Sequence, residues 1–348
     1  MKRNVVVIVV IFGLLVWGCS KVDTQPQGLK LTLAKNIADI NNAIGKISKT
    51  KGYQVLTLKE DPAARVIDPT SFRDSITLSL VAGIYDYQVD TIMLHHNFAY
   101  PFRLFKKTGT SDMMVVNLPQ KLIFHPRYLH NFIKSDSVLV NDFTISASDY
   151  HFYYNSWNSL DYKLKAGLTL KSEDLGSFDI SAASSSYKNN SNSSEFTFPG
   201  GYSVSTSWQS GDTSKLSFAL LKDNNPLLLE ITLFAGNNFF RREKQYDLTI
   251  GNIEIKRGFG IDSIQVFQDG ILQKTAGAKI IDSADSTGTI CSKRDILLTF
   301  DDGTTEKLSN LIGPPLAQLK TLISSLHDMF FAEHIVDFIA INIYFNSR

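Results

Sequence analysis

The chain has 348 residues, with 35 Lys and Arg against 34 Asp and Glu, and its formal net charge is +1 at pH 7. This balance excludes long-range attraction of the whole protein to DNA or to an anionic membrane, so we expect no nucleic-acid partner. The length suits two domains or one large sheet domain.

The N-terminus has the pattern of an export signal. Two positive residues, Lys2 and Arg3, precede an apolar run from Val5 to Trp17. A run of about 13 residues has the length of a signal-peptide core and is too short to span a bilayer. The run leads into Gly18 and Cys19, and a small residue before Cys resembles a bacterial lipobox. The resemblance implies that cleavage follows Gly18 and that Cys19 carries a lipid.

This interpretation divides the chain into three parts. Residues 1–18 are a lipoprotein signal peptide, residues 19–28 a lipidated tether, and residues 29–348 an ectodomain with a candidate sub-boundary near 236–246. By resemblance to bacterial sorting rules, Ser20 in place of Asp after the Cys favours the outer membrane. Surface-exported lipoproteins often carry an acidic run there, whereas this tether has only Asp23. We therefore expect a membrane anchor at Cys19 and favour the periplasmic face over the cell surface.

The ectodomain begins with a predicted helix. Between Leu29 and Lys51, apolar residues recur at three and four positions and form one stripe. The stripe consists of Leu33, Ile37, Ile40, Ile44 and Ile47. Gly52 follows as a predicted stop. We expect a short strand over Val55 to Leu58, and the alternation of apolar residues favours a strand over Ser71 to Val81.

A long alternating tract runs from Phe143 to Phe234. Its clearest segment, Tyr162 to Lys171, places apolar residues at even positions and polar residues or Gly at odd positions. This period of two predicts a half-buried strand. Turn-forming clusters separate such segments, for example Glu173 to Gly176 and Asp223 to Pro226. Links this short predict an antiparallel meander, because parallel crossovers need a dozen or more residues.

Strands are also predicted on both sides of this tract. The earlier ones cover Gly83 to Tyr87, Met114 to Pro119 and Lys121 to Pro126. Further alternating segments follow as far as Leu311, split by turn signals such as Gly251-Asn252 and Asp301-Asp302-Gly303. Pro314-Pro315 then predicts the start of a C-terminal helix. Its apolar stripe is Leu316, Leu319, Leu322, Ile323, Leu326 and Phe330.

The order of these pieces resembles a group of uncharacterised Bacteroidota outer-membrane lipoproteins. The features that carry the resemblance are the lipobox, a helical N-terminus, the Gly83-Ile84-Tyr85-Asp86-Tyr87 strand and the long meander. The resemblance brings no known activity with it. Together with the periodicities, it leads us to expect an α+β fold, mostly antiparallel β. A large curved sheet with packed N- and C-terminal helices is the first architecture, and a two-sheet sandwich is the second.

The sequence contains no motif that assigns catalysis. Gly201 to Ser205 lacks the second Gly of a nucleophile elbow, and Gly258 to Gly260 lacks the third Gly of a dinucleotide fingerprint. The histidines lack metal-ligand spacing, and Cys291 is a lone thiol. We therefore assign no catalytic residue, metal ligand or cofactor.

Aromatic residues are denser than candidate catalytic groups. Tyr153 and Trp157 lie on or near the polar side of the alternation, where exposed rings stack on sugars or line a lipid groove. We take these two as candidate ligand-facing residues. The favoured function is a non-enzymatic envelope protein that binds a hydrophobic or glycan ligand or a protein partner. The alternative is a hydrolase acting on envelope or other glycans.

The lipobox generates the first prediction. Replacing Cys19→Ala should leave the protein unprocessed or release it from the membrane fraction, because no lipid can be attached. Fractionation and intact-mass measurement would show this, and Cys291→Ala, which alters the other thiol, should behave like the wild type. Normal membrane fractionation and mass for the Cys19 variant would contradict the anchor.

Overall fold

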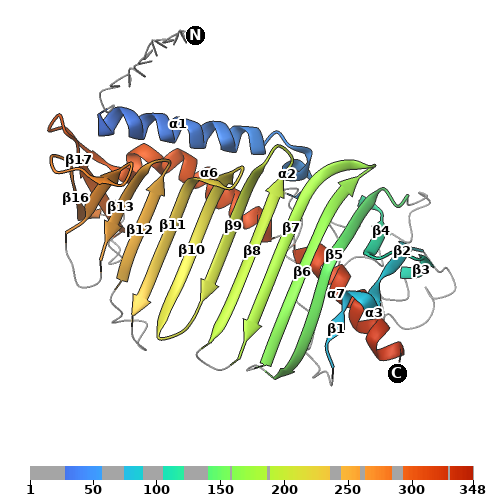
Figure 1. Cartoon of the computed structure of the whole chain (residues 1–348). Helices are drawn as coiled ribbons and strands as arrows, with labels where there is room; N and C mark the ends of the chain where they lie inside the picture. The colour runs from blue at the N-terminus through green and yellow to red at the C-terminus, as the bar shows by residue number, and fades with distance from the viewer. Residues whose placement is uncertain are drawn as a thin grey trace, which may run out of the picture.

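The computed structural model describes residues 28–56, 74–88, 105–120, 140–156, 159–185, 189–235, 244–258, 263–283, 293–327 and 330–347. The candidate strand over Lys121 to Pro126 lies outside these ranges. The described chain forms a large sheet, a small second sheet and helices at both ends (Figure 1).

The central strands confirm the predicted meander. They are β5 (Phe143–Ser156), β6 (Ser159–Leu170), β7 (Glu173–Ser184), β8 (Asn190–Phe198), β9 (Tyr202–Gln209), β10 (Thr213–Lys222) and β11 (Asn225–Ala235). The sheet continues through β12 (Lys244–Ile250), β13 (Ile253–Arg257), β14 (Gln265–Gln268) and β15 (Ile271–Leu272). Beyond β5 lie β1 (Ile76–Thr77), β2 (Gly83–Tyr87), β3 (Phe105–Gly109) and β4 (Met114–Leu118).

These strands form a single 15-stranded sheet within the described residues. Their order across the sheet is β15-β14-β13-β12-β11-β10-β9-β8-β7-β6-β5-β4-β2-β3, and β1 also pairs with β5. Among the described strands, β2 and β4 pair in parallel and the other pairs are antiparallel. The second sheet contains β16 (Gly277–Ser283), β17 (Lys293–Thr299) and β18 (Thr305–Lys307). Because β11 and β12 pair directly, the large sheet runs on across the candidate sub-boundary near 236–246.

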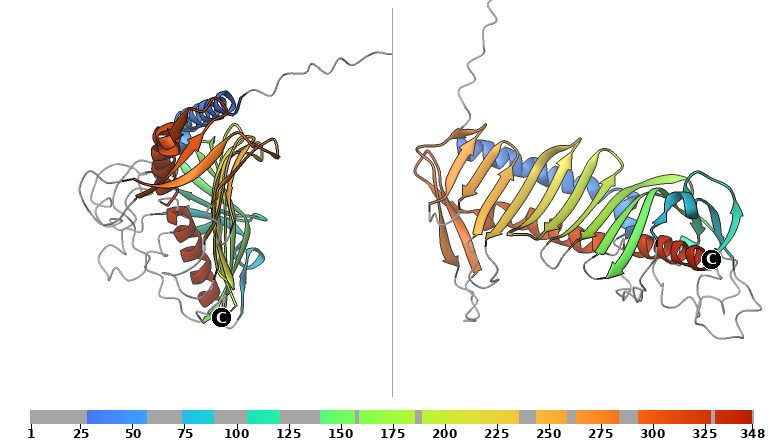
Figure 2. Two further views of the ribbon diagram at one scale, coloured as in Figure 1. Left: turned by 90° about the vertical axis from the view of Figure 1, so that its left-hand side faces the viewer. Right: turned by 60° about the horizontal axis from the view of Figure 1, so that its bottom comes forward.

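The two faces of the sheet differ as the alternation predicts. Leu164 and Leu168 of β6 are at most 1% exposed, whereas Lys163 and Lys165 point to the exposed face. Helices α1 (Leu29–Ile47), α6 (Leu308–His327) and α7 (Phe330–Asn346) all lie on one side, as the edge-on view in Figure 2 shows. We call the face that carries Leu164 and Leu168 the helix side, and the opposite face the open face. The first of the two expected architectures, a sheet with packed terminal helices, is therefore confirmed.

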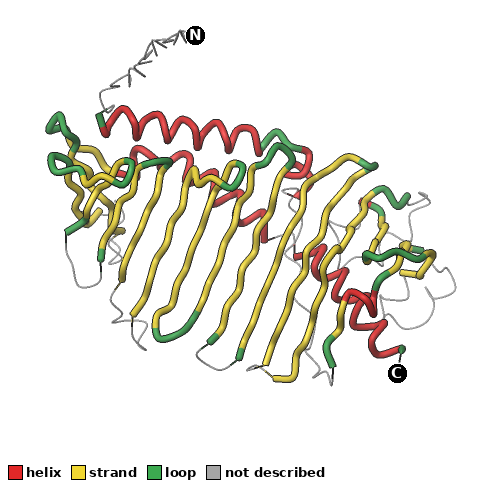
Figure 3. The backbone as a smooth tube through the Cα atoms, in the orientation of Figure 1, coloured by secondary structure: helices red, strands yellow, loops and turns green. Residues whose placement is uncertain are grey.

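Helix α1 lies along the ends of the strands in Figure 3. Its predicted stripe, Leu33, Ile37, Ile40, Ile44 and Ile47, is buried, and Leu29 and Ala43 are buried with it. Asn36 donates hydrogen bonds to the carbonyl of Ile250 at 2.8 Å and to Oδ1 of Asn252 at 2.9 Å. Gly251, with φ of +60°, makes this approach possible, since a Cβ there would lie 2.6 Å from the Asn36 side chain. The hydrogen bonds of Asn36 thus hold the helix against the β12–β13 turn, and Gly251 leaves room for its side chain.

The region after α1 corrects two predictions. The first helix ends at Ile47, and Gly52 lies inside a second helix, α2 (Lys51–Leu56), which also contains Val55 in place of the expected strand. A Cβ on Gly52 would lie 2.0 Å from the carbonyl oxygen of Leu175, so this glycine permits close contact with β7 and does not act as a stop. In the described part of the segment from Ser71 to Val81, residues 74–81, β1 is the strand and α3 (Leu78–Val81) is helical.

One turn lies two residues earlier than predicted. Strand β7 already begins at Glu173, and the β6–β7 turn is formed by Lys171 and Ser172, with φ of 51° and 67°. Two consecutive left-handed residues are what a two-residue hairpin turn requires. Gly176, predicted to be part of the turn, lies within β7 next to a register shift of β7 against β6. A Cβ on Gly176 would lie 2.4 Å from the Thr197 carbonyl oxygen.

The C-terminal helix begins at Leu308 and not at Pro314. The reason is a cap from β17: Asp295 accepts hydrogen bonds from the backbone N–H of Ser309 at 3.2 Å and from its hydroxyl. Partial burial opposes ionisation of Asp295, but the hydrogen bonds from Ser309 and the Ile296 amide outweigh it and hold the pKa below its ordinary value. A helix start is stabilised by such an acceptor. Within the described residues, no helix has both the length and the apolar character needed to cross a membrane.

The burial pattern of β6 generates the second prediction. Replacing Leu168→Asp should lower the free energy of unfolding by several kcal/mol, because it buries an unpaired charge. Gln209→Asp introduces the same charge at an exposed position opposite Lys215 and should change stability by about 0.5 kcal/mol or less. Denaturant unfolding of both variants measures the difference, and equal effects would contradict the register.

Candidate functional site

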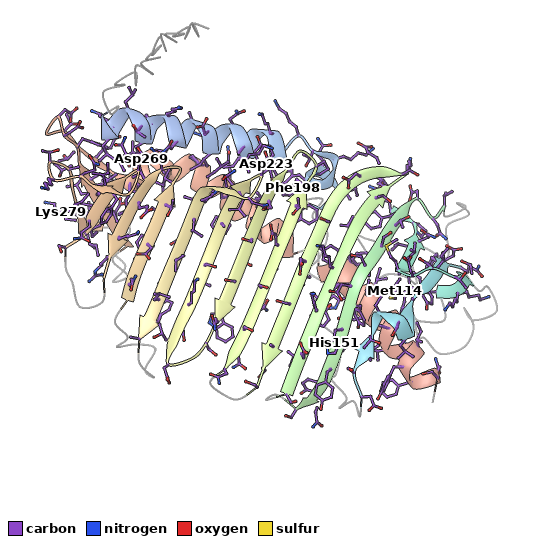
Figure 4. All side chains as sticks on the ribbon, in the orientation of Figure 1. Met114, His151, Phe198, Asp223, Asp269 and Lys279 are labelled. Carbon is purple, nitrogen blue, oxygen red and sulfur yellow. The ribbon has the colours of Figure 1, made fainter. Side chains whose placement is uncertain are left out.

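The helix side of β8 to β12 is divided into an apolar half and a polar half. Near Phe198, labelled in Figure 4, the helix-side residues are apolar and at most 4% exposed. They are Phe196, Val204, Leu220, Leu228 and Ile250, paired across neighbouring strands. Toward the other end of the same strands, this face carries Asn192, Ser194, Thr206, Trp208, Leu216, Phe218, Glu230, Thr232 and Tyr246. We call these nine residues the Trp208 patch.

Strand pairing arranges the patch in two rows. One row runs Asn192, Trp208, Leu216, Thr232 and Tyr246. The other runs Ser194, Thr206, Phe218 and Glu230. Neighbouring strands are about 4.8 Å apart, so adjacent members of a row are in contact range of one ligand.

Two apolar members of the patch, Trp208 and Leu216, are exposed although they lie on the helix side. Trp208 is 40% exposed and Leu216 is 48% exposed. Helix α1 contacts β11 and β12, and α7 is held against β5 and β6, so the described helices leave this part of β8 to β10 accessible. An exposed indole ring is thereby placed beside hydroxyl and amide groups.

Glu230 is oriented by Tyr246. Burial first, and then the charge of Glu230 and a hydrogen bond to it, raise the pKa of the Tyr246 hydroxyl well above its ordinary value of 10.0. Tyr246 therefore stays neutral near pH 7, and its hydroxyl donates a hydrogen bond to the Glu230 carboxylate. A carboxylate has about four acceptor positions, so Glu230 keeps capacity for donors from a ligand.

A second cluster of polar groups is buried beneath α7. The hydroxyls of Tyr150 on β5 and Tyr162 on β6 both donate to Oδ1 of Asp337, at 3.0 and 3.2 Å. Asp337 is 6% exposed, and Glu333, one helical turn earlier on the same face, is 8% exposed. Burial, followed by the charge of Asp337, raises the pKa of both tyrosines well above its ordinary value. This cluster binds the C-terminal helix to the sheet and is closed to solvent.

The residues predicted from the sequence lie elsewhere. Tyr153 is partly exposed on the open face of β5, opposite Asp161, whose Oδ2 lies 3.2 Å from Nε2 of His151. Trp157 and Cys19 lie outside the described residues. Tyr153 and the Trp208 patch are therefore on opposite faces of the sheet and cannot bind the same small ligand.

Sequence reasoning placed Trp208 in a strand but did not single it out. The available signal was the change from apolar to polar residues along one face of β8 to β11, which periodicity alone does not interpret. Among the described residues, no three His, Cys, Asp or Glu side chains gather closely enough to hold a metal ion. Comparison of the chain with protein-family models, with curated proteins and with solved structures finds no match.

The buried tyrosines generate the third prediction. A folded-state pKa above 10 means that the native state holds the phenol proton more tightly than the unfolded state, so stability is present below pH 10 and falls above it. The decline should reach about 1.4 kcal/mol per pH unit for each such tyrosine. Replacing both Tyr150→Phe and Tyr162→Phe should make the alkaline decline shallower.

Unfolding by denaturant between pH 8 and pH 11 would measure these slopes. An alkaline decline as steep in the double variant as in the wild type would contradict the assignment of the buried cluster.

Proposed function

We propose that the protein is a non-enzymatic envelope lipoprotein, anchored at the outer membrane through Cys19, whose ectodomain binds a glycan at the Trp208 patch. The observation that carries the proposal is the exposed Trp208 indole on the helix side of the sheet, set among amide, hydroxyl and carboxylate groups. The anchor and the periplasmic location are supported by the lipobox and by the residues after Cys19.

The chemistry of the patch favours a sugar over a purely hydrophobic ligand. A pyranose ring has one apolar face, which stacks on an indole, and a rim of hydroxyls that need partners. Asn192 is directly beside Trp208, and Thr206 and Glu230 lie in the adjacent row. A lipid chain would leave these polar groups buried without hydrogen bonds, which costs free energy. The mixture of ring and polar side chains therefore matches a polyhydroxylated ligand.

The alternative function, a glycan hydrolase, receives less support from the same residues. Such enzymes use two carboxylates about 5 to 10 Å apart across the scissile bond. Glu230 is the one carboxylate among the described helix-side residues of β8 to β12. The patch therefore supports binding of a glycan over its hydrolysis.

The fourth prediction concerns Trp208. In calorimetric titrations of the mature protein with a panel of soluble oligosaccharides from envelope and plant polysaccharides, Trp208→Ala should weaken binding at least tenfold, about 1.4 kcal/mol. Trp208→Phe, which keeps a smaller ring, should lose less. Tyr153→Ala removes a ring from the open face and serves as the matched control.

Two outcomes would overturn the proposed ligand. Loss of binding in Tyr153→Ala but not in Trp208→Ala would move the site to the open face. Binding of fatty acids or detergents, with no oligosaccharide bound, would replace the glycan by a hydrophobic ligand.

A further inference from the structure

One end of the molecule exposes three large apolar side chains. Ile271 and Leu272, which form edge strand β15, are 68% and 41% exposed, and Leu31 in the first turn of α1 is 60% exposed. Thr32, the next residue, is hydrogen-bonded through Oγ1 to Nε2 of Gln268 at 3.2 Å. Because Gln268 pairs with Ile271, the three apolar side chains lie at the same end of the molecule, with Ile271 and Leu272 on the two faces of the edge strand. We call Leu31, Ile271 and Leu272 the apolar tip.

The chain enters the ectodomain at this same end. Figures 1 and 2 place the start of α1 beside β13 to β17, and Lys30 contacts Asp302 and Thr304 in the β17–β18 turn. Cys19 precedes Gly28 by a short tether. Even a fully extended chain between them spans only roughly 30 Å. A lipid on Cys19 would therefore hold the apolar tip close to the bilayer.

Because the sheet is long, a membrane contact at its β15 end would determine how the whole molecule is oriented on the bilayer. With about 4.8 Å between strands, the path from β15 to β3 is on the order of 60 Å long. The tether alone would let the sheet lie flat or stand upright on the membrane. A second contact at the β15 end would select the upright orientation.

Resting on the proposed anchor at Cys19, we infer that the apolar tip inserts into the interfacial region of the bilayer and stands the sheet on its β15 end. We choose a lipid surface as the partner of the apolar tip because a short tether to a lipidated Cys19 would keep this end of the molecule next to the bilayer. Exposed Lys274 and Lys279, the latter labelled in Figure 4, follow β15 in the chain and suit the phosphates of lipid headgroups.

The upright orientation gives the Trp208 patch a defined height. Trp208 lies on β9, which is six strands from β15 in the sheet order. At about 4.8 Å per strand, the patch lies roughly 30 Å from the membrane surface. A glycan bound there would be held clear of the lipid headgroups, facing sideways from the sheet.

The test uses the full acylated protein reconstituted into phosphatidylcholine vesicles. An environment-sensitive nitrobenzoxadiazole label is attached at Leu272→Cys, in a Cys291→Ser background that removes the remaining free thiol. The control label is at Val140→Cys, a residue 66% exposed just before β5, on the order of 50 Å away along the sheet. We expect a blue-shifted emission and quenching by doxyl-labelled lipid at position 272, and neither at position 140.

A further variant separates the apolar contact from the lysines. Adding Ile271→Ser and Leu31→Ser to the labelled protein should abolish the blue shift while the protein still floats with the vesicles through its lipid. In 0.5 M NaCl the shift should persist, because salt screens charges and not apolar contacts.

The outcomes distinguish the tip from the anchor. Flotation without any spectral change at position 272, or equal changes at positions 272 and 140, would overturn the docking of the tip and leave the anchor intact. Failure of the wild-type protein to float, with Cys19 unmodified by mass, would overturn the anchor and the inference together. Loss of the shift in high salt would replace the apolar contact by an electrostatic one.

Discussion

The structure depends on covering one apolar face of a long sheet, and the small second sheet reaches that sheet only at its β14 end among the described residues. The meander from β5 to β14 buries alternate residues on a single side, and burying each Leu or Ile there contributes about 1.5 to 3 kcal/mol. The cover comes from the two ends of the chain: α1 and α2 before the meander, and α6 and α7 after it. Both ends must therefore be in place before the central strands are fully stabilised, which couples distant parts of the sequence.

The open face needs less cover because many of its side chains are small, polar or charged, and its apolar ones, such as Leu229, Ile231 and Leu233 of β11, are half-buried. On β7 to β10, Ser181 is hydrogen-bonded to Ser193 at 2.7 Å, and Ser207 to Ser217 at 2.6 Å. On β5 and β6, Lys163 forms an ion pair with Asp149 at 2.5 Å, and this contact raises the pKa of Lys163. The edges are protected in a different way: β15 has two residues, and β3 carries exposed lysines. Short or charged edge strands oppose pairing with other chains.

The sequence predicts those features that depend on neighbours along the chain. The strand from Tyr162 to Leu170 and the stripe of α1 follow from periodicity. The errors occur where residues far away in the sequence determine the local structure. Asp295 moves the start of α6 back to Leu308. The close approach of the Leu175 carbonyl requires a glycine at position 52, inside a helix. The candidate site has the same limitation. The exposure of Trp208 depends on where α1, α6 and α7 leave the sheet uncovered, and no local pattern contains that information.

The incomplete helical cover also explains why the helix side changes its chemistry along β8 to β11. Around Phe196 and Leu220 the helix-side residues of these strands are mostly apolar, and toward the other end hydroxyls, an amide and a carboxylate occupy the same face. If that area served only stability, small polar residues of the kind found on the open face would suffice. An exposed Trp208 and Leu216 cost solubility without adding to the core. The proposed ligand, which would contact both kinds of group, accounts for the position of Trp208 and Leu216 beside Asn192 and Glu230.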